Sequence, residues 1–239
     1  MYNNKKVCVI IPCYRVKDRI ETVINNIDLK IVDKIFVIDD NCPEKTGQYL
    51  KKKVKNKKIE IIILNKNLGV GGATKHGFSK ALQQDYNFLF KIDGDGQHDP
   101  SQILEFLETL ERTNSNFCKG SRFMDQNEIK KIPLIRYFGN IILTKITEKN
   151  TNIKNLTDAV NGYLVVKSSI LKKINFTKIS NNFFFEEDLL FHLSYHNINL
   201  CEVPIKAIYF EKSNLNPIKV IIPFLINHIK NYINKNYDS

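Results

Sequence analysis

Two aspartates spaced one residue apart are the residues of this chain best suited to chemistry. Asp93 and Asp95 follow directly after an apolar run, in the stretch Lys-Ile-Asp-Gly-Asp-Gly-Gln-His-Asp-Pro. Residues two apart in an extended or turning backbone can point to the same side, so these carboxylates can hold one Mg²⁺ or Mn²⁺. Such an ion keeps open positions for the phosphates of a substrate. The alternative is a solvated Asp-Gly turn between a strand and a helix that starts near Pro100.

The spacing of glycines and carboxylates excludes three common ligand-binding loops. A calcium-binding EF-hand loop beginning at Asp93 meets His98 where it requires glycine. A dinucleotide-binding fingerprint over the glycine-rich segment meets Thr74 in place of its third glycine. A phosphate-binding P-loop in the same segment meets Phe78 where it requires lysine. The remaining interpretation is a metal site in a different α/β fold.

The composition indicates one globular enzyme domain that attracts anions. Of the 239 residues, 43% are hydrophobic, which is enough for a core, and no Pro/Ser/Gly-rich linker divides the chain. The formal charge of +11 attracts nucleic acid, anionic lipid headgroups or nucleotide diphosphates. Aromatic and basic residues are not interleaved in a way that suits base stacking. We therefore expect no nucleic-acid partner.

Cysteine usage and hydropathy predict a cytoplasmic protein that does not cross a membrane. The five cysteines form no C-x-x-C pair and are odd in number, which favours a reducing compartment. The N-terminus runs into a strand without an apolar signal region. The apolar stretch 220–229 is too short for the ~20 residues that a membrane span needs. Residues 216–239 predict an amphipathic helix that follows a catalytic domain at 1–215 and either lies on an anionic membrane surface or closes the domain.

The apolar periodicity alternates between strands and helices, which predicts an α/β fold with a mainly parallel central sheet. We expect strands at residues 7–11, 34–38, 59–64 and 87–92, and helices at 16–27, 45–53, 71–84 and 182–197. Ligands of such sheets bind beyond the carboxyl ends of the strands. The residues expected there are Pro12 and Tyr14, Asp39 and Asp40, segment 65–71 and segment 93–97.

These loops carry residues suited to a nucleotide. Tyr14 can flank a base, and Asp39 can accept hydrogen bonds from a base or ribose, unless it is a turn or N-cap carboxylate. The glycine-rich segment 67–75 brings backbone close to a phosphate at a helix N-terminus, unless its glycines serve helix packing. Lys119 and Arg122, expected after the next strand, offer cations for a diphosphate or lie as surface charge.

In content, order and spacing, these residues resemble the inverting family 2 glycosyltransferases, in the branch similar to dolichyl-phosphate mannose synthase. The similarity covers roughly residues 5–220. The motifs that carry it are residues 9–14, 37–40, 67–75, 91–97, 119–123, 136–140, 158–163 and 187–190.

The resemblance implies a GT-A fold, a Rossmann-like architecture that binds a nucleotide-diphosphate sugar together with Mg²⁺ or Mn²⁺. In that family Asp39 would contact the base and Arg122 would lie near the donor. Asp93, Asp95 and Gln97 would surround the metal. The candidate donor-binding residues are Pro12, Tyr14, Asp39, Asp40, Gly71, Lys75, Asp93 and Arg122.

The same resemblance makes Asp188 the candidate general base. An acceptor hydroxyl attacks the anomeric carbon while the nucleoside diphosphate leaves, so a carboxylate on the acceptor side can take the proton. Glu187 and Asp188 lie near the start of a predicted helix and resemble the acceptor-side motif of the family, with Glu187 as the second candidate. The alternative is that these acids only favour the helix dipole.

Departures from the family pattern concern the acceptor. Lipid-phosphate mannosyl synthases usually have Glu after the Pro-x-Tyr-Asn start, where this chain has Arg15 and Val16. They also place Arg after the Val-Pro-Ile run, where this chain has only Lys206 and Lys212. We therefore expect the acceptor to be a sugar hydroxyl of a lipid-linked glycan in cell-surface polysaccharide synthesis, with polyprenyl phosphate as the alternative. Two further functions stay open on the sequence, a nucleotidyltransferase and a non-catalytic sugar-nucleotide-binding module.

Overall fold

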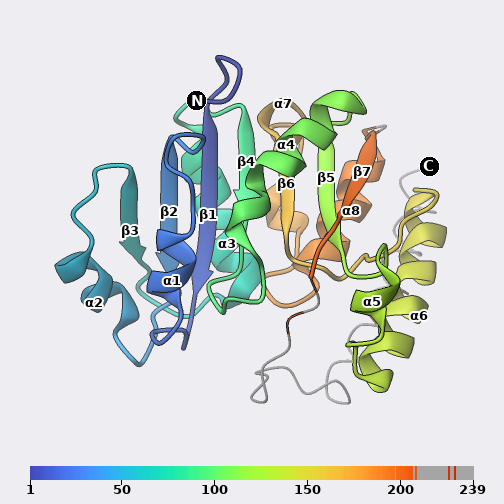
Figure 1. Cartoon of the computed structure of the whole chain (residues 1–239), viewed down its shortest axis with the longest axis horizontal. Helices are drawn as coiled ribbons and strands as arrows, with labels where there is room; N and C mark the ends of the chain where they lie inside the picture. Colours follow the sequence, from blue (N-terminus) through green and yellow to red (C-terminus); the bar gives the residue numbers. More distant parts are fainter. Residues whose placement is uncertain (197, 207, 209–225, 227–228, 230–239) are drawn as a thin grey trace.

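The computed structural model describes residues 1–196 and 198–206, together with 208, 226 and 229. Within these residues, seven strands form one sheet in the order β3-β2-β1-β4-β6-β5-β7 (Figure 1). The strands are β1 Val7–Cys13, β2 Lys34–Asp39, β3 Ile59–Ile63, β4 Phe88–Lys91, β5 Phe117–Ser121, β6 Leu164–Lys167 and β7 Leu200–Pro204. All pairings between them are parallel except those of β6, which runs antiparallel to β4 and β5. The predicted α/β fold with a mainly parallel sheet is confirmed.

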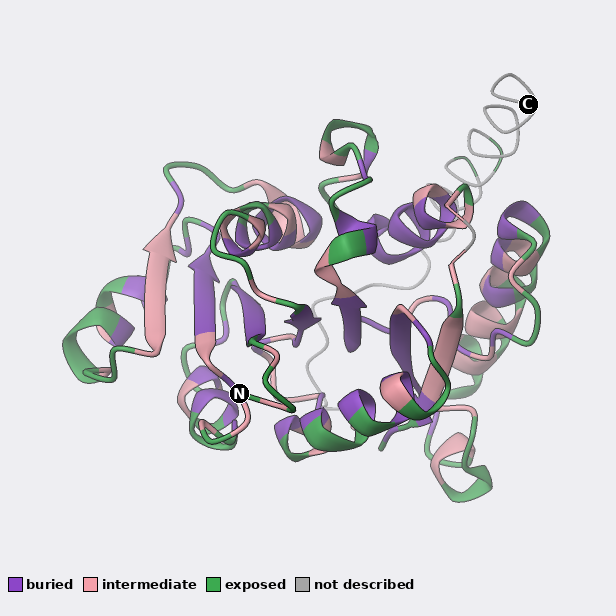
Figure 2. Ribbon diagram, turned by 90° about the horizontal axis from the view of Figure 1, so that it is seen from above, coloured by how far each residue is buried: buried purple, intermediate pink, exposed green. Residues whose placement is uncertain are grey.

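Helices cover both faces of this sheet (Figure 2). The helices are α1 Ile20–Asn25, α2 Thr46–Lys53, α3 Gly69–Leu82, α4 Ile103–Arg112, α5 Gln126–Ile129, α6 Leu134–Thr151, α7 Ser168–Leu171 and α8 Phe185–Ser194, with short 3₁₀ turns η1 Pro100–Gln102 and η2 Phe176–Lys178. Strand β1 is buried along its whole length, and its alternate side chains point to opposite faces of the sheet. Val7 and Val9 pack with α1 and α4, whereas Cys8 and Ile10 pack with α3 and α8. The period of two along a strand thus produces two apolar layers.

Two elements differ from their expected extent. The helix expected at 16–27 is confined to α1, because the carbonyl of Val16 accepts hydrogen bonds from the backbone N–H groups of Arg19 and Ile20 in a turn. Residues 119–122 were expected to follow a strand, but residues 119–121 belong to β5 itself. Lys119 in this strand is fully buried. The other strands and helices agree with the prediction within a few residues.

The amphipathic helix expected at 216–239 falls outside the described residues, apart from Ile226 and Ile229. The division between this segment and a domain at 1–215 therefore stays a prediction. Among the residues that the structure describes, no helix is both long and apolar enough to span a bilayer.

Candidate active site

Loops from different strands meet at one edge of the sheet, as the topology of parallel strands requires. Gly94, in the loop after β4, packs against the loop after β1. A Cβ added to Gly94 would lie 3.2 Å from the carbonyl oxygen of Pro12 and 3.3 Å from Cγ2 of Val16. Tyr14 is exposed beside them, with the guanidinium carbon of Arg15 5.5 Å from its ring centroid. The first and fourth strands thus contribute adjoining walls to the site.

The predicted metal ligands lie in a tight turn after β4. Oδ1 of Asp95 accepts a hydrogen bond from the backbone N–H of Gln97 at 3.0 Å, and Gly96 between them has φ of 78°, which glycine adopts without strain. Burial and the neighbouring Asp93 carboxylate raise the pKa of Asp95 to about 6. Two adjacent carboxylates form an oxygen donor set that suits Mg²⁺ or Mn²⁺. In the described part of the chain, no group of three or more His, Cys, Asp or Glu side chains is placed to hold a metal ion, and metal binding by Asp93, Asp95 and Gln97 stays a prediction.

His98 supports this turn from the protein interior. Its Nδ1 accepts a hydrogen bond from the backbone N–H of Asp93 at 3.1 Å, and its ring stacks on that of Tyr163 with centroids 5.1 Å apart. Burial lowers the pKa of His98 to about 4, so the imidazole is neutral near pH 7. The neutral ring of His98 therefore holds the loop by stacking on Tyr163 and by accepting the hydrogen bond from Asp93.

A buried lysine links the predicted metal-binding turn to the start of α8. Nζ of Lys91 lies 2.7 Å from Oδ1 of Asp93 and 2.7 Å from Oε1 of Glu186 at the start of α8. Burial opposes the charge on Lys91, but the two carboxylates outweigh it and raise the pKa of Lys91 above its usual value. Burial likewise works against ionisation of Asp93, yet Lys91 holds the pKa of Asp93 below its usual range. The predicted metal ligand is therefore kept ionised.

Gly162 lets the loop before β6 approach this charged group. A Cβ at Gly162 would lie 2.5 Å from Nζ of Lys91 and 2.6 Å from Oδ2 of Asp93, closer than real Cβ contacts allow. The loop reaches this place because β6 is antiparallel and begins where the neighbouring strands end. The backbone of Gly162 is thus part of the wall of the site.

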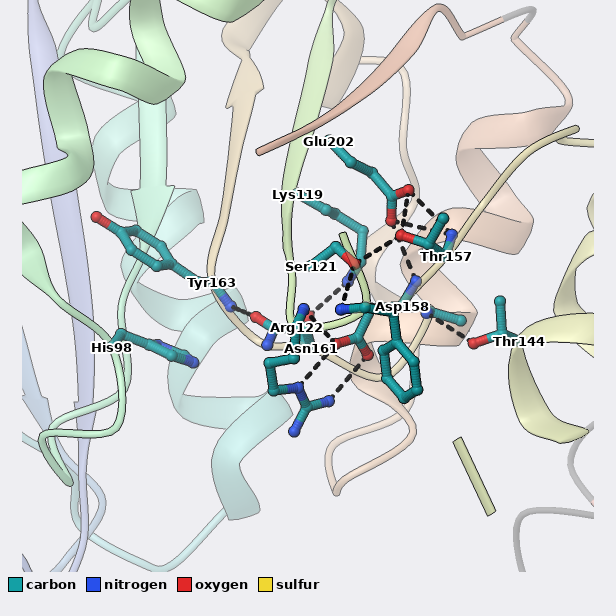
Figure 3. Close-up of polar contacts among 12 residues, drawn as sticks. His98, Lys119, Ser121, Arg122, Thr144, Thr157, Asp158, Asn161, Tyr163 and Glu202 are labelled. Atoms are coloured by element: carbon teal, nitrogen blue, oxygen red, sulfur yellow. Dashed lines mark hydrogen bonds and ion pairs between the residues drawn. The ribbon is translucent and has the colours of Figure 1, made fainter. Parts of the chain in front are cut away.

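The only arginine among the donor candidates is fixed by a buried aspartate (Figure 3). Oδ2 of Asp158 accepts a hydrogen bond from Nε of Arg122 at 2.7 Å, and Oδ1 accepts one from Nη2 at 2.8 Å. Glu202 in β7 in turn accepts hydrogen bonds from the backbone N–H groups of Thr157 and Asp158. The two hydrogen bonds that Arg122 donates to Asp158 set the direction of the Arg122 side chain.

Lys119 serves the same loop from inside the protein. Its ammonium donates a hydrogen bond to the carbonyl oxygen of Asn161, and Oδ1 of Asn161 accepts one from the backbone N–H of Tyr163 at 2.8 Å. Burial lowers the pKa of Lys119. Lys119 is fully buried, so the expectation of a surface charge or a diphosphate ligand at this position is wrong.

The adjacent carboxylates after β2 hold two loops. Oδ1 of Asp39 accepts a hydrogen bond from the backbone N–H of Cys42 at 2.7 Å, and Oδ2 accepts one from the first turn of α2. Asp40 accepts hydrogen bonds from the backbone N–H groups of Leu68 and Gly69 at 2.7 and 2.8 Å, where α3 begins. The turn and cap role that the sequence left open is therefore present, and base recognition by Asp39 stays a prediction.

The glycine-rich start of α3 packs against Ser180 and Asn181, which precede α8. A Cβ at Gly71 would lie 2.5 Å from the carbonyl oxygen of Ser180. Nζ of Lys75 donates hydrogen bonds to the carbonyl oxygens of Phe176 and Ile179 at 3.1 and 2.5 Å. These contacts match the helix-packing alternative, and phosphate binding by Gly71 or Lys75 stays a prediction.

Three consecutive acidic residues at the start of α8 are buried in different environments. Oδ2 of Asp188 accepts hydrogen bonds from the backbone N–H of Ser180 at 3.0 Å and from the hydroxyl of Ser180. Neither carboxylate oxygen of Glu187 has a hydrogen-bond partner among the described residues. Burial, followed by the charge of Glu186, raises the pKa of Glu187 well above its usual value. The two candidate bases therefore differ, because Asp188 is held by a neighbouring segment and Glu187 is not.

Sequence reasoning missed the two ion pairs that organise the site. Lys91 forms the end of an apolar strand, and a charge in such a strand must find a partner, which was the available signal. The motif that contains Asp158 contributed to the family resemblance without an assigned role. Nothing in the local sequence indicates that the partner of Lys91 is Glu186 or that the partner of Asp158 is Arg122.

Comparisons with known proteins agree with this geometry. A UDP-N-acetylglucosamine dolichyl-phosphate N-acetylglucosaminyltransferase of Methanococcus voltae is 29% identical over 236 residues, covering 93% of this chain and 94% of that protein. A polyprenol monophosphomannose synthase of Mycolicibacterium smegmatis is 23% identical over 208 residues, covering 84% and 77%.

Solved structures share the fold. The glucosyl-3-phosphoglycerate synthase of Mycobacterium tuberculosis, in complex with Mn²⁺, UDP and glucosyl-3-phosphoglycerate, aligns with a TM-score of 0.61 at 13% identity, covering 94% of this chain and 80% of that one. This likeness confirms the GT-A fold. The model of the family described as Glycosyl transferase family 2 matches residues 8–174, a stretch that includes the turn with Asp93 and Asp95, Arg122 and Asp158. The chain belongs to glycosyl transferase family 2.

Proposed function

We propose that this glycosyltransferase moves a sugar from a nucleotide-diphosphate donor to the phosphate of a polyprenyl lipid. The observation that carries this acceptor is the similarity, along 93% of the chain, to a dolichyl-phosphate N-acetylglucosaminyltransferase. Further relatives are named for polyprenol, dolichol and undecaprenyl phosphate. From the sequence we expected a sugar hydroxyl as the acceptor and polyprenyl phosphate as the alternative. The proposal now prefers polyprenyl phosphate. It puts the protein at the cytoplasmic face of a membrane.

The environment of Asp188 supports a phosphate acceptor. A phosphate oxygen that is already ionised attacks without giving up a proton, so the reaction needs no general base. Asp188 holds the backbone and hydroxyl of Ser180, which precedes α8. In the proposal Asp188 positions this acceptor-side segment and takes no proton.

The proposed step is a single inverting displacement. An oxygen of the lipid phosphate forms a bond to the anomeric carbon as the bond from that carbon to the nucleoside diphosphate breaks, and the electron pair leaves with the diphosphate. A bound Mg²⁺ or Mn²⁺ would neutralise the charge that grows on the leaving group. Asp93, Asp95 and Gln97 are the residues proposed to hold it. Arg122, oriented by Asp158, would face the donor phosphates.

The nucleoside end of the donor is proposed to lie between the loops after β1 and β2. Pro12 and Tyr14 offer an apolar wall and an exposed ring. Asp39 and Asp40 keep the second loop in place through their backbone hydrogen bonds. Direct contact of Asp39 with the base remains part of the proposal.

The test is a transfer assay with matched lipids. The full chain is incubated with Mn²⁺, a panel of UDP, GDP and dTDP sugars, and polyprenyl phosphate, polyprenol or a lipid-linked sugar. Mass spectrometry is expected to show one added sugar on polyprenyl phosphate and none on polyprenol. Transfer to the lipid-linked sugar alone would reject the phosphate acceptor, and transfer to none of the lipids from any donor would reject the proposal entirely.

Transfer to a sugar hydroxyl is the second candidate function, and Glu187 favours it. Neither oxygen of this buried carboxyl has a hydrogen-bond partner among the described residues, so both are available to accept a hydrogen bond from a sugar hydroxyl. Under this alternative, Glu187→Gln lowers turnover by about 10²-fold or more with unchanged nucleotide affinity. Near-normal turnover of Glu187→Gln would exclude Glu187 as the base.

A further inference from the structure

The N-terminal half of α6 exposes large apolar side chains. Leu134, Ile135, Phe138 and Ile142 are 73%, 63%, 59% and 55% exposed. Spacings of three and four residues place Ile135, Phe138 and Ile142 on one face of the helix. The buried residues of α6 are instead polar and lie in its C-terminal half: Thr144, Thr147, Asn150 and Thr151. The first half of α6 therefore turns apolar side chains toward solvent, whereas an ordinary surface helix turns them toward the core.

This part of α6 adjoins the edge of the sheet where the site lies. Phe123, which follows Arg122 at the carboxyl end of β5, stacks on Tyr137 with ring centroids 5.8 Å apart. Farther along α6, Oγ1 of Thr144 accepts a hydrogen bond at 3.1 Å from the backbone N–H of Ala159, in the loop that carries Asp158. Figure 1 shows α5 and α6 side by side at the end of the sheet beyond β5 and β7. A partner seated on the start of α6 would thus lie next to the donor-binding arginine.

The charge around this apolar face is positive. Residues 126–154 contain six Lys or Arg and two Glu. Both glutamates are paired within the segment, Glu128 with Lys131 and Glu148 with Lys145, at 2.6 Å each. Apolar side chains flanked by cations are typical of helices that lie on anionic lipid. A second copy of the chain would bring the same positive charges together, which opposes association through this face.

We infer that Leu134, Ile135, Phe138 and Ile142, here called the α6 apolar face, insert into the surface of an anionic lipid bilayer. The inference rests on the proposed function in that a lipid acceptor presents its phosphate at such a surface. Docking through the α6 apolar face brings the carboxyl end of β5, with Arg122, to the lipid headgroups. The sequence had pointed to residues 216–239 for membrane contact, whereas this surface belongs to the catalytic domain.

A single fluorescent reporter tests the inference directly. The chain contains no tryptophan, so Phe138→Trp gives the full chain one indole on the α6 apolar face, and Leu104→Trp on α4 is the exposed control. The emission of Phe138→Trp is expected to be that of a water-exposed indole in buffer. It should shift to shorter wavelength with phosphatidylglycerol vesicles and less with phosphatidylcholine vesicles, while Leu104→Trp stays unchanged.

Two other occupants give different results in the same experiment. If another segment of the chain covers this face, the emission is already shifted in buffer and vesicles leave it unchanged. If a second copy covers it, the shift follows protein concentration without vesicles. Either result would overturn the inference.

Vesicle co-sedimentation measures the contribution of the face. The double variant Ile135→Ser and Phe138→Ser is expected to lose about 10-fold or more in affinity for phosphatidylglycerol vesicles, because binding scales with buried apolar area. Leu104→Ser should bind like the unchanged chain, and melting curves should show that both variants fold. Undiminished binding of the double variant rejects the inference.

The vesicles contain neither donor nor polyprenyl phosphate, so this result is separate from the transfer assay. Vesicle binding without transfer to any lipid would reject the proposed function alone. Transfer without dependence on the α6 apolar face would reject the docking surface alone.

Discussion

Nζ of Lys91 lies 2.7 Å from Oε1 of Glu186, although 95 residues separate the two in the chain. The pair joins the end of β4, where the predicted metal ligands follow, to the first turn of α8, where the two candidate bases Glu187 and Asp188 lie. The same ammonium lies 2.7 Å from Asp93. One buried cation therefore connects the turn after β4 to the start of α8.

Removing this cation should be costly. Lys91→Met leaves the carboxylates of Asp93 and Glu186 without their buried partner, which is expected to lower the free energy of unfolding by about 3 kcal/mol or more. Urea unfolding measures the change. Lys51→Met, at an exposed position of α2, is the control and should stay within about 0.5 kcal/mol of the unchanged chain. Equal stability of both variants would show that the cluster carries no net stabilisation.

Two glycines should respond to alanine in opposite directions. Gly162→Ala forces a Cβ against Lys91 and Asp93 and is expected to destabilise the protein by about 1 to 3 kcal/mol. Gly139→Ala in α6 meets nothing within 4 Å and should stabilise the helix by about 0.5 to 1 kcal/mol. Thermal unfolding of both variants compares them, and a stabilised Gly162→Ala variant would contradict the described packing.

Nucleotide binding should depend on a divalent cation. Asp95→Asn removes one of the two adjacent carboxylates and is expected to weaken Mn²⁺-dependent binding of the nucleoside diphosphate by at least about 10-fold. Calorimetry with and without chelator measures this affinity. Asp85→Asn, at an exposed turn outside the site, serves as the control. Equal affinities for unchanged chain and Asp95→Asn variant, with or without chelator, would remove the metal from donor binding.

Asp188 should behave as a positioning residue. If Asp188 acts only by holding Ser180, Asp188→Asn and Ser180→Ala each lower turnover by less than about 10-fold, and the double variant is no worse than the stronger single one. If Asp188 is the general base that the sequence suggested, Asp188→Asn alone loses about 10²-fold or more. Transfer rates and nucleotide affinities on the same preparations separate the two roles.

Cys201 should be the most reactive thiol of the chain. A hydrogen bond with Cys118 lowers the pKa of Cys201 to about 7, whereas burial raises the pKa of Cys8. Iodoacetamide reacts with the thiolate, so labelling of Cys201 is expected to rise with pH up to about 7 and then level off. Mass spectrometry of labelled peptides follows each cysteine. If labelling of Cys201 instead rises with pH up to about 8.5, as for an ordinary thiol, the hydrogen bond with Cys118 does not lower the pKa of Cys201.

The donor half of the fold was predictable because its signals are local. Continuous apolar runs such as 7–11 mark buried strands, and parallel strands must place their carboxyl ends together. Asp93 and Asp95 therefore fall at the site without any knowledge of packing. The fate of Lys119 was not predictable, because the hydrogen bond that buries its ammonium goes to Asn161, 42 residues away.

The chemical type of a residue was also easier to predict than its partner. The sequence shows carboxylates at Asp39 and Asp40 but does not show which backbone N–H groups they accept from. Gly71 signals close approach of the backbone, and the protein group that approaches it is the carbonyl of Ser180. Tertiary contacts between distant segments decide such assignments.

The ion pair between Lys91 and Glu186 has a consequence for how variants of this enzyme can arise. The stretch that matches the family model ends at residue 174, shortly after β6, and so stops before Glu186 and Asp188. The similarity to the Methanococcus voltae relative covers 93% of the chain and therefore continues through α8, which the buried charge of Lys91 ties to the stretch that the family model matches. Because one buried ammonium is shared by Asp93 and Glu186, a substitution at either carboxylate changes the environment of the other, and the two positions are expected to vary together.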